Sequence, residues 1–247
     1  MLFRSPSVYG PKPATYNGWV TDLFLPAGTV LHHEIEVKRS RFLAEISRVS
    51  TPEEARLAID CRKDEMPDAR HHCTAFAVSV LDSSPLLHSS DDGEPSGTAG
   101  RPMLEVLRGV PLLDTVAIVT RYFGGTLLGT GGLVRAYSDA VKECLEGALL
   151  LERHIVPVWE TVLPHADGGR YLSELAGSGF TAEPEYEAEG VRARISTARG
   201  AELADLLARL SSGKASVEQI GRATIETPWG TITGGNAVRR DGNTART

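Results

Sequence analysis

Cysteine is scarce in this chain of 247 residues, which has three in all. They are Cys61, Cys73 and Cys144, which lie far apart and form no C-x-x-C pair. An odd and sparse set of this kind is typical of reduced thiols in a cytoplasm, and it fits neither a disulfide framework nor a zinc cluster. We therefore expect a cytoplasmic protein without disulfide bonds.

Long apolar runs are lacking as well. No stretch approaches the roughly 20 residues that a membrane-spanning helix needs. The first thirty residues hold four prolines and no compact apolar segment of the kind found in signal peptides. We therefore expect no membrane association. We predict that residues 1–28 form an extended arm, ordered only if it docks on the domain that follows.

An excess of basic residues is the third absence. The chain has 26 Lys and Arg against 32 Asp and Glu, which gives a formal net charge of −6. This balance provides no electrostatic footprint for strong non-specific binding to nucleic acid, although a local basic patch is compatible with it. With 41% hydrophobic and 23% charged residues, the composition is that of a globular protein with one large domain or two ordinary ones.

Hydrophobic periodicity predicts a first α+β domain over residues 29–152. The stretches LHHEIEV and RFLAEISRV alternate apolar and polar residues, which is the pattern of strands. Thr51 before Pro52, with Glu54 three residues after the threonine, predicts the start of a helix. Further strands are expected over 73–81 and 115–123, a long turn-rich loop over 82–102, and helices over 103–109 and 132–147.

Residues 155–228 repeat a different pattern, β-α-β-β-α-β, which is the split βαβ or ferredoxin-like arrangement. The remaining residues, 229–247, are small and polar, so we predict a flexible tail there. The chain as a whole is thus predicted to be an α+β protein of two domains.

A glycine-rich loop lies between the predicted strand 115–123 and the helix after it. In such a position, backbone N–H groups and the helix dipole can face an anion. However, the loop matches neither G-x-x-x-x-G-K-[ST] nor G-x-G-x-x-G, and no lysine occurs between Lys63 and Lys142. A Walker-type nucleotide enzyme is therefore disfavoured. The five glycines are Gly124, Gly125, Gly129, Gly131 and Gly132.

The glycines have two interpretations that stay open at this point. They can bind a ligand, because Arg121 and Arg135 flank the loop with fork-shaped donors. They can also serve the backbone alone, by allowing close approach or positive φ.

Two polar stretches complete the candidate site. Asp91, Asp92, Gly93 and Glu94 form an acidic turn whose spacing does not match a calcium loop, and a solvated turn is favoured over a metal site. His71 and His72 begin a strand, where neighbouring side chains point to opposite faces and so cannot both readily ligate one ion. Hydrogen-bonded histidines are therefore favoured, and we expect no metal and no cofactor.

Four long stretches of the chain carry a resemblance: KRSRFLAEI (38–46), DARHHCTAFAV (68–78), SDDGEPSGTAGRPMLEVL (90–107) and VTRYFGGTLLGTGGLVRAYSDAV (119–141). Together they resemble the IMPACT family, in its two-domain bacterial form. The resemblance implies a first domain like the second domain of ribosomal protein S5, and a ferredoxin-like second domain similar to the fifth domain of elongation factor G. Eukaryotic members of the family regulate translation by competing for a ribosome-associated activator of an initiation-factor kinase.

The resemblance implies a translation-associated regulator, more a binding protein than an enzyme, whose first-domain loops hold RNA, the ribosome or a protein partner. The alternative is a hydrolase-like enzyme of small molecules, with a cleft where the HH, SDDGEP and glycine-loop stretches meet. For that alternative no catalytic residue can be assigned from the sequence. The family's most characteristic residues fall on His71, His72, Asp91, Asp92, Gly93, Glu94 and the five glycines of the loop.

Overall fold

The computed structural model describes residues 22–80 and 83–239, and these form two compact units. The first unit contains the chain up to Glu152 together with the residues from Pro228 on, and the second contains Arg153–Thr227. The described residues hold five helices and two sheets, which confirms the predicted mixed α+β class. None of the helices among these residues is long and apolar enough to cross a membrane.

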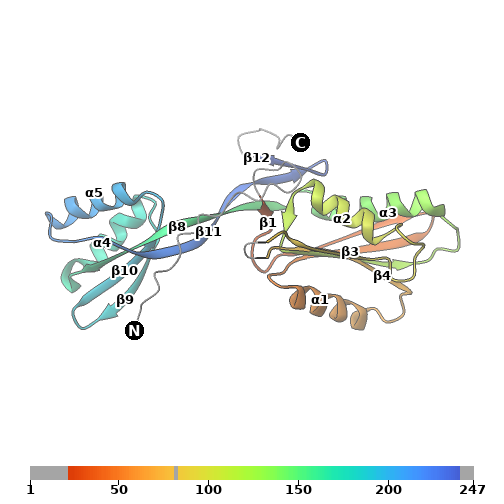
Figure 1. Cartoon of the computed structure of the whole chain (residues 1–247), viewed down its shortest axis with the longest axis horizontal. Helices are drawn as coiled ribbons and strands as arrows, with labels where there is room; N and C mark the ends of the chain where they lie inside the picture. The colour runs from red at the N-terminus through yellow and green to blue at the C-terminus, as the bar shows by residue number, and fades with distance from the viewer. Residues whose placement is uncertain (1–21, 81–82, 240–247) are drawn as a thin grey trace. The chain divides into compact units, whose positions relative to one another are not determined.

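The first unit is built on a five-stranded sheet with the order β2-β3-β7-β4-β5, in which every neighbouring pair is antiparallel. Helix α1 (Pro52–Glu65) covers one face, and α2 (Gly100–Gly109) and α3 (Gly129–Leu145) cover the other (Figure 1). Cover on both faces explains why β4 and β7 are buried along nearly their whole length. The strands are β2 (Val30–Val37), β3 (Ser40–Arg48), β7 (Thr115–Tyr122), β4 (His71–Val78) and β5 (Leu86–Ser90).

Helix α1 begins where the sequence predicts. The hydroxyl of Thr51 accepts a hydrogen bond from the backbone N–H of Glu54 at 3.1 Å, and Pro52 occupies the first turn. The carboxylate of Glu54 in turn accepts the N–H of Ser50 at 2.6 Å. Two N–H groups at the helix start are satisfied in this way, close to the pattern of a capping box.

The predicted loop over 82–102 differs from the structure at its start. Residues 86–90 form β5, which pairs with β4 from Thr74↔Ser90 to Val78↔Leu86. The stretch LLHSS does not alternate, so its own sequence gives no strand signal. Its strand conformation comes from hydrogen bonding to the buried strand beside it.

The predicted N-terminal arm is partly wrong. Residues 1–21 lie outside the described part of the chain, but β1 (Leu23–Phe24) runs parallel to β6 (Leu112–Leu113) and antiparallel to the first residues of β8 (Leu149–Leu163). The side chains of Leu23, Phe24 and Leu25 are all buried. This apolar LFL segment is therefore part of the core of the first unit rather than an arm.

The predicted flexible tail is also wrong for residues 229–239. Strand β11 (Glu218–Thr233) continues through Thr233 and pairs with β12 (Asn236–Arg239) across a two-residue turn. Gly234 and Gly235 supply the positive φ angles that such a turn needs. Residues 240–247 lie outside the described part of the chain. The hairpin is held by three side chains buried in the core, those of Trp229, Ile232 and Ala237.

The second unit follows the predicted order of elements, β8-α4-β9-β10-α5-β11, with the strand order β11-β8-β10-β9. Its core lies between the helices and one face of the sheet, around Leu163, Leu175 and Leu207. The likeness of each unit to the named domain folds stays a prediction. The new elements are α4 (His165–Gly177), β9 (Ala182–Glu187), β10 (Gly190–Ser196) and α5 (Gly200–Ser211).

Candidate functional site

The loop between β5 and α2 is organised by the carboxylate of Asp91. It accepts hydrogen bonds from three backbone N–H groups, those of Gly97 (2.7 Å), Ala99 (3.0 Å) and Gly100 (2.9 Å). Burial alone would raise the pKa of Asp91, but these three hydrogen bonds outweigh it and hold the pKa below its ordinary value. The N-cap residue of α2 provides no side-chain cap, so Asp91 takes that role from a distance in the sequence.

Asp92 joins this loop to the two histidines. Its carboxylate accepts the backbone N–H of His72 at 2.7 Å and lies 3.7 Å from the ammonium of Lys63. Its carbonyl oxygen lies 2.8 Å from Nδ1 of His71, so Nδ1 is the protonated nitrogen of that ring. Gly93 has a φ of +87° and packs beside the same ring.

The two histidines serve opposite faces of the sheet, as strand alternation requires. His72 is buried on the α1 side, with Nδ1 3.1 Å from the hydroxyl of Thr120, and burial lowers the pKa of its imidazole. His71 lies on the other side, against the Asp92 carbonyl. Among the described residues, no group of three or more His, Cys, Asp or Glu side chains is arranged to hold a metal ion.

Glu94 and Arg121 form a buried ion pair at the centre of the site. Nη1 of Arg121 lies 2.6 Å from Oε1 of Glu94, and the two side chains are 7% and 3% exposed. The hydroxyl of Tyr137 donates to the same carboxylate oxygen at 2.8 Å and accepts from the Cys73 thiol at 3.3 Å. Burial raises the pKa of the Tyr137 hydroxyl and raises that of the Cys73 thiol to about 12. Cys73 is therefore a protonated core thiol at neutral pH, not a nucleophile.

The ion pair corrects the expectation that both arginines flank the glycine loop as available donors. Arg121 lies within the sheet, where it pairs in register with Phe42 and His71. Its guanidinium sits 5.3 Å from the ring of Phe42 and 5.6 Å from that of Phe123. Arg135 is exposed on α3, so of the two arginines it is the one whose side chain is open to solvent.

Backbone geometry accounts for three of the five glycines in the loop. A Cβ atom on Gly124 would lie 2.0 Å from the carbonyl carbon of Arg39, so no other residue fits without a shift of the neighbouring turn. Gly125 and Gly129 have φ angles of +83° and +73°, which favour glycine. A Cβ on Gly131 would meet open space, and one on Gly132 would contact only the side chain of Leu128.

An exposed face surrounds this loop. Arg39 donates from Nη2 to the hydroxyl of Thr126 at 3.1 Å, so the β2–β3 turn and the glycine loop are in direct contact. Phe123 is 52% exposed and Leu127 is 83% exposed, although both are large apolar residues. We use the name glycine-loop face for the exposed residues of this turn, of the loop and of the helix that follows it, which are Lys38, Arg39, Phe123, Leu127 and Arg135.

The three stretches that the hydrolase-like alternative requires do come together. His71 meets Asp92, and Glu94 meets Arg121. However, the contacts that the structure shows for these polar groups are with one another, inside the protein.

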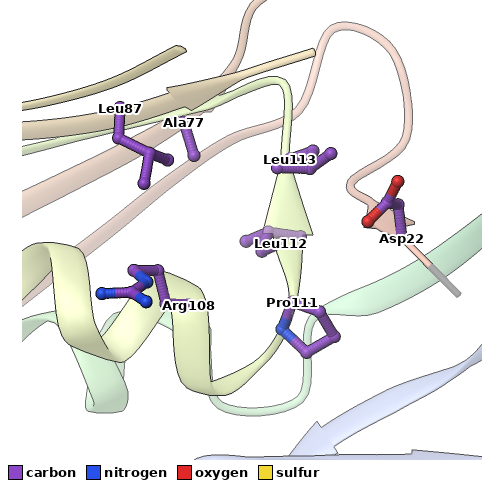
Figure 2. Close-up of a pocket in the computed structure, with 7 residues that line it drawn as sticks. All are labelled: Asp22, Ala77, Leu87, Arg108, Pro111, Leu112 and Leu113. Atoms are coloured by element: carbon purple, nitrogen blue, oxygen red, sulfur yellow. The ribbon is translucent and has the colours of Figure 1, made fainter. Parts of the chain in front are cut away.

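The structure contains a small pocket elsewhere in the first unit (Figure 2). Its cavity of about 20 Å³ has room for about one water molecule. None of its lining residues belongs to the three stretches, so it does not provide the cleft of the alternative. They are Asp22, Ala77, Leu87, Arg108, Pro111, Leu112 and Leu113.

Comparison with known proteins decides the family. Residues 38–145 match the family model described as the Impact N-terminal domain. The chain is 38% identical over 189 residues to "IMPACT family member YvyE" of Bacillus subtilis, covering 76% of this chain and 86% of that protein. The chain belongs to the IMPACT family.

Two further likenesses agree with membership of the IMPACT family. "IMPACT family member YigZ" of Escherichia coli is 41% identical over 156 residues, covering 58% of this chain and 76% of that protein. A crystal structure described as that of "an hypothetical protein" is 33% identical, with a TM-score of 0.51, and covers 82% of this chain and 97% of that one. The family match spans the whole of the site, from the β2–β3 turn to the end of α3.

Sequence reasoning missed two residues of the site within this IMPACT segment. Tyr137 lies two turns into α3, and its hydroxyl points into the core, where it binds Glu94. A buried tyrosine hydroxyl usually needs a polar partner, which is the signal that its sequence position offered. Ser40 is wholly buried at the start of β3, and its hydroxyl accepts the N–H of Gly124 at 3.1 Å. The signal for Ser40 was its place within the family stretch KRSRFLAEI; its contact, 84 positions away, comes only from the fold.

Proposed function

We propose that this IMPACT-family chain is a translation-associated regulator that binds ribosomal RNA through the glycine-loop face. Membership of the family supports the association with translation. The observation that carries the RNA contact is the exposure of an aromatic ring and of basic side chains together. Phe123 and Arg39 are both exposed, on a loop and a turn that touch each other.

The chemistry of this face fits an unpaired stretch of RNA. An exposed aromatic ring offers a platform on which an unstacked base can lie, worth about 1–3 kcal/mol per base in known complexes. Lys38, Arg39 and Arg135 supply positive charge for the phosphates. The first turn of α3 adds backbone N–H groups, and its N-cap residue, Leu128, provides no side-chain cap for them.

The whole-chain charge limits how such binding behaves. A chain with a net charge of −6 does not attract RNA as a whole, so the proposed contact depends on the few cations of this face. Few phosphate contacts imply a shallow dependence of affinity on salt, with a slope of about 1 for each contact.

The test is co-sedimentation of the full chain with purified ribosomes over a series of salt concentrations. Lys38→Ala/Arg39→Ala is expected to weaken binding on the order of tenfold at low salt and to lower the salt slope by about 2. The control, Arg56→Ala/Arg170→Ala, removes the same charge from exposed ion pairs on α1 and α4 and is expected to leave binding unchanged.

Phe123→Ala separates base stacking from charge alone. It is expected to lower affinity on the order of tenfold with no change in the salt slope, because the ring carries no charge. Absence of ribosome binding by the unsubstituted chain at low salt would defeat the proposal. Binding that survives both nuclease treatment of the ribosomes and high salt would point to a protein partner instead.

A further inference from the structure

Ser40 touches both the buried ion pair and the backbone of the glycine loop. Its hydroxyl accepts a hydrogen bond from the N–H of Gly124 at 3.1 Å and faces Nη2 of Arg121 at 3.5 Å. The residue is wholly buried, so water cannot replace these partners. Through Arg121 the contact reaches Glu94, which belongs to the SDDGEP stretch.

The turn that precedes Ser40 is held in a costly conformation. Lys38 and Arg39 have φ angles of +48° and +66°, in the left-handed region that ordinary side chains rarely adopt. A two-residue hairpin of this kind usually has glycine or asparagine at these positions. Such backbone persists only where its surroundings fix it. Here the backbone of Arg39 lies against Gly124, which has no Cβ to keep it away.

The hydrogen bond between Ser40 and Gly124 does more than satisfy a buried hydroxyl. Ser47 lies on the same strand, is also buried, and its hydroxyl has no hydrogen-bond partner within the described part of the chain. Strand β3 therefore tolerates a buried serine hydroxyl that makes no hydrogen bond to the described residues. The contact of Ser40 is thus a specific arrangement at the end of the strand where the turn and the loop meet.

From this geometry we infer that Ser40 is a positioning residue, which fastens the glycine loop to the Glu94–Arg121 pair and so presents Phe123 and Arg39 in one fixed arrangement. The identity of the bound partner in this inference rests on the proposed function, whereas the hydrogen-bonded connection between the loop and the ion pair does not. It also gives the SDDGEP stretch a role: Glu94 fixes Arg121, and Arg121 and Gly124 share the Ser40 hydroxyl.

The fastening is tested by amide hydrogen exchange of Ser40→Ala, followed residue by residue with nuclear magnetic resonance. Loss of the acceptor is expected to speed exchange of the Gly124 amide on the order of tenfold. Exchange in the middle of β3 should stay as in the unsubstituted chain. A serine with a merely structural role would instead loosen the whole first unit. The matched control is Ser47→Ala, which should leave the Gly124 amide unchanged.

The effect of Ser40 on the arrangement of Phe123 and Arg39 is tested by ribosome co-sedimentation of the same variants. Ser40→Ala is expected to weaken binding on the order of tenfold, and Ser40→Thr, which restores the hydroxyl, to recover most of it. The inference is overturned if Gly124 exchange is unchanged in Ser40→Ala, if Ser47→Ala matches it, or if Ser40→Ala binds ribosomes as well as the unsubstituted chain does. Because exchange needs no partner, a negative ribosome result for the unsubstituted chain defeats the proposed function and leaves the fastening to be decided by the exchange rates.

Discussion

Each unit of the chain contains an Arg–Glu contact of the same length in a different setting. In the first unit, Nη1 of Arg121 lies 2.6 Å from Glu94, with both side chains less than a tenth exposed. In the second unit, Nη1 of Arg192 also lies 2.6 Å from Glu160, but these side chains are 28% and 18% exposed. The sheet of the first unit has helices on both faces. In the second unit, by contrast, the side chains of Arg192 and Glu160 are partly exposed to solvent.

The difference shows that distance alone does not tell what an ion pair does. The exposed contacts form a network of ion pairs, because Arg192 also binds Glu187 at 2.7 Å and Arg194 binds Glu160 at 3.1 Å. Hydrogen bonds from Arg194 and Arg192 lower the pKa of Glu160, but water screens such pairs and makes them weak contributors to stability. The buried pair needs Tyr137 to satisfy it, and it fixes one geometry.

The largest effect is expected from breaking the buried pair on one side. Arg121→Met leaves the Glu94 carboxylate buried without its cation, which should cost about 3–5 kcal/mol in the free energy of unfolding, measured with urea. Arg121→Met/Glu94→Gln removes both charges and should recover most of that loss. If the single and double variants are equally unstable, the pair is not the source of the effect.

The next largest effect on stability is expected from replacing a glycine that the backbone geometry requires, compared with one that it does not require. Gly124→Ala places a Cβ where the carbonyl carbon of Arg39 would be 2.0 Å away, so we expect a loss of about 1–3 kcal/mol or more. Gly131→Ala adds a methyl group in open space within α3 and should stabilise the protein by up to about 1 kcal/mol. Equal effects in thermal unfolding would contradict the distinction.

A smaller effect on stability is expected from replacing Asp91, whose carboxylate binds backbone N–H groups rather than a charged side chain. Asp91→Ala leaves three N–H groups without their acceptor, and by analogy with helix caps this should cost about 0.5–2 kcal/mol at neutral pH. Asp91→Asn keeps an acceptor oxygen and should lose less. A loss in Asp91→Ala no greater than that in Asp91→Asn would argue against the capping role.

Asp91 also predicts a dependence on pH. The pKa of its carboxyl is lower in the folded chain than its ordinary value of about 3.9, so its contribution is fully present above that value. The contribution disappears as the pH falls through the lowered pKa of the folded state. Urea unfolding from neutral pH to about pH 3 should therefore show a smaller loss of stability in Asp91→Ala than in the unsubstituted chain.

The smallest effect is expected in the second unit. Glu160→Gln removes the shared partner of Arg192 and Arg194, yet both arginines stay in water and keep other carboxylates nearby. The change in unfolding free energy should be smaller than that of Asp91→Ala, and it should shrink further as salt is added. A loss as large as that of Arg121→Met would break the comparison between the two settings.

Local patterns in the sequence predict most of the elements. Alternation in LHHEIEV predicts β2, and Thr51 with Pro52 predicts the start of α1, because in both cases the signal lies within a few residues of the element. The patterns fail for β5 and β12, whose residues form strands only because a neighbouring strand is present. Apolar side chains spaced among glycines, as at Ile232 and Ala237, give too weak a signal to oppose the prediction of a tail.

The sequence indicates which candidate residues lie near one another, but not the contacts that they make, and their role in binding stays a prediction. His71, Asp91, Asp92, Glu94 and the glycines do lie together, as the family stretches indicate. Which of them face inward depends on pairings between residues far apart, such as Glu94 with Arg121, 27 positions away. Strand alternation shows that two side chains point to opposite faces, but not that helices cover both of those faces.

The burial of two of the three cysteines gives the chain a natural attachment point for a probe. Burial raises the pKa of the Cys73 thiol and of the Cys144 thiol to about 12, so neither forms a thiolate at neutral pH. Cys61 is the exposed one, on α1. A maleimide dye added to the unsubstituted chain should therefore attach at a single position, on the side of the sheet opposite α3 (Figure 1), and leave the glycine-loop face unaltered for tests of the proposed ribosome binding.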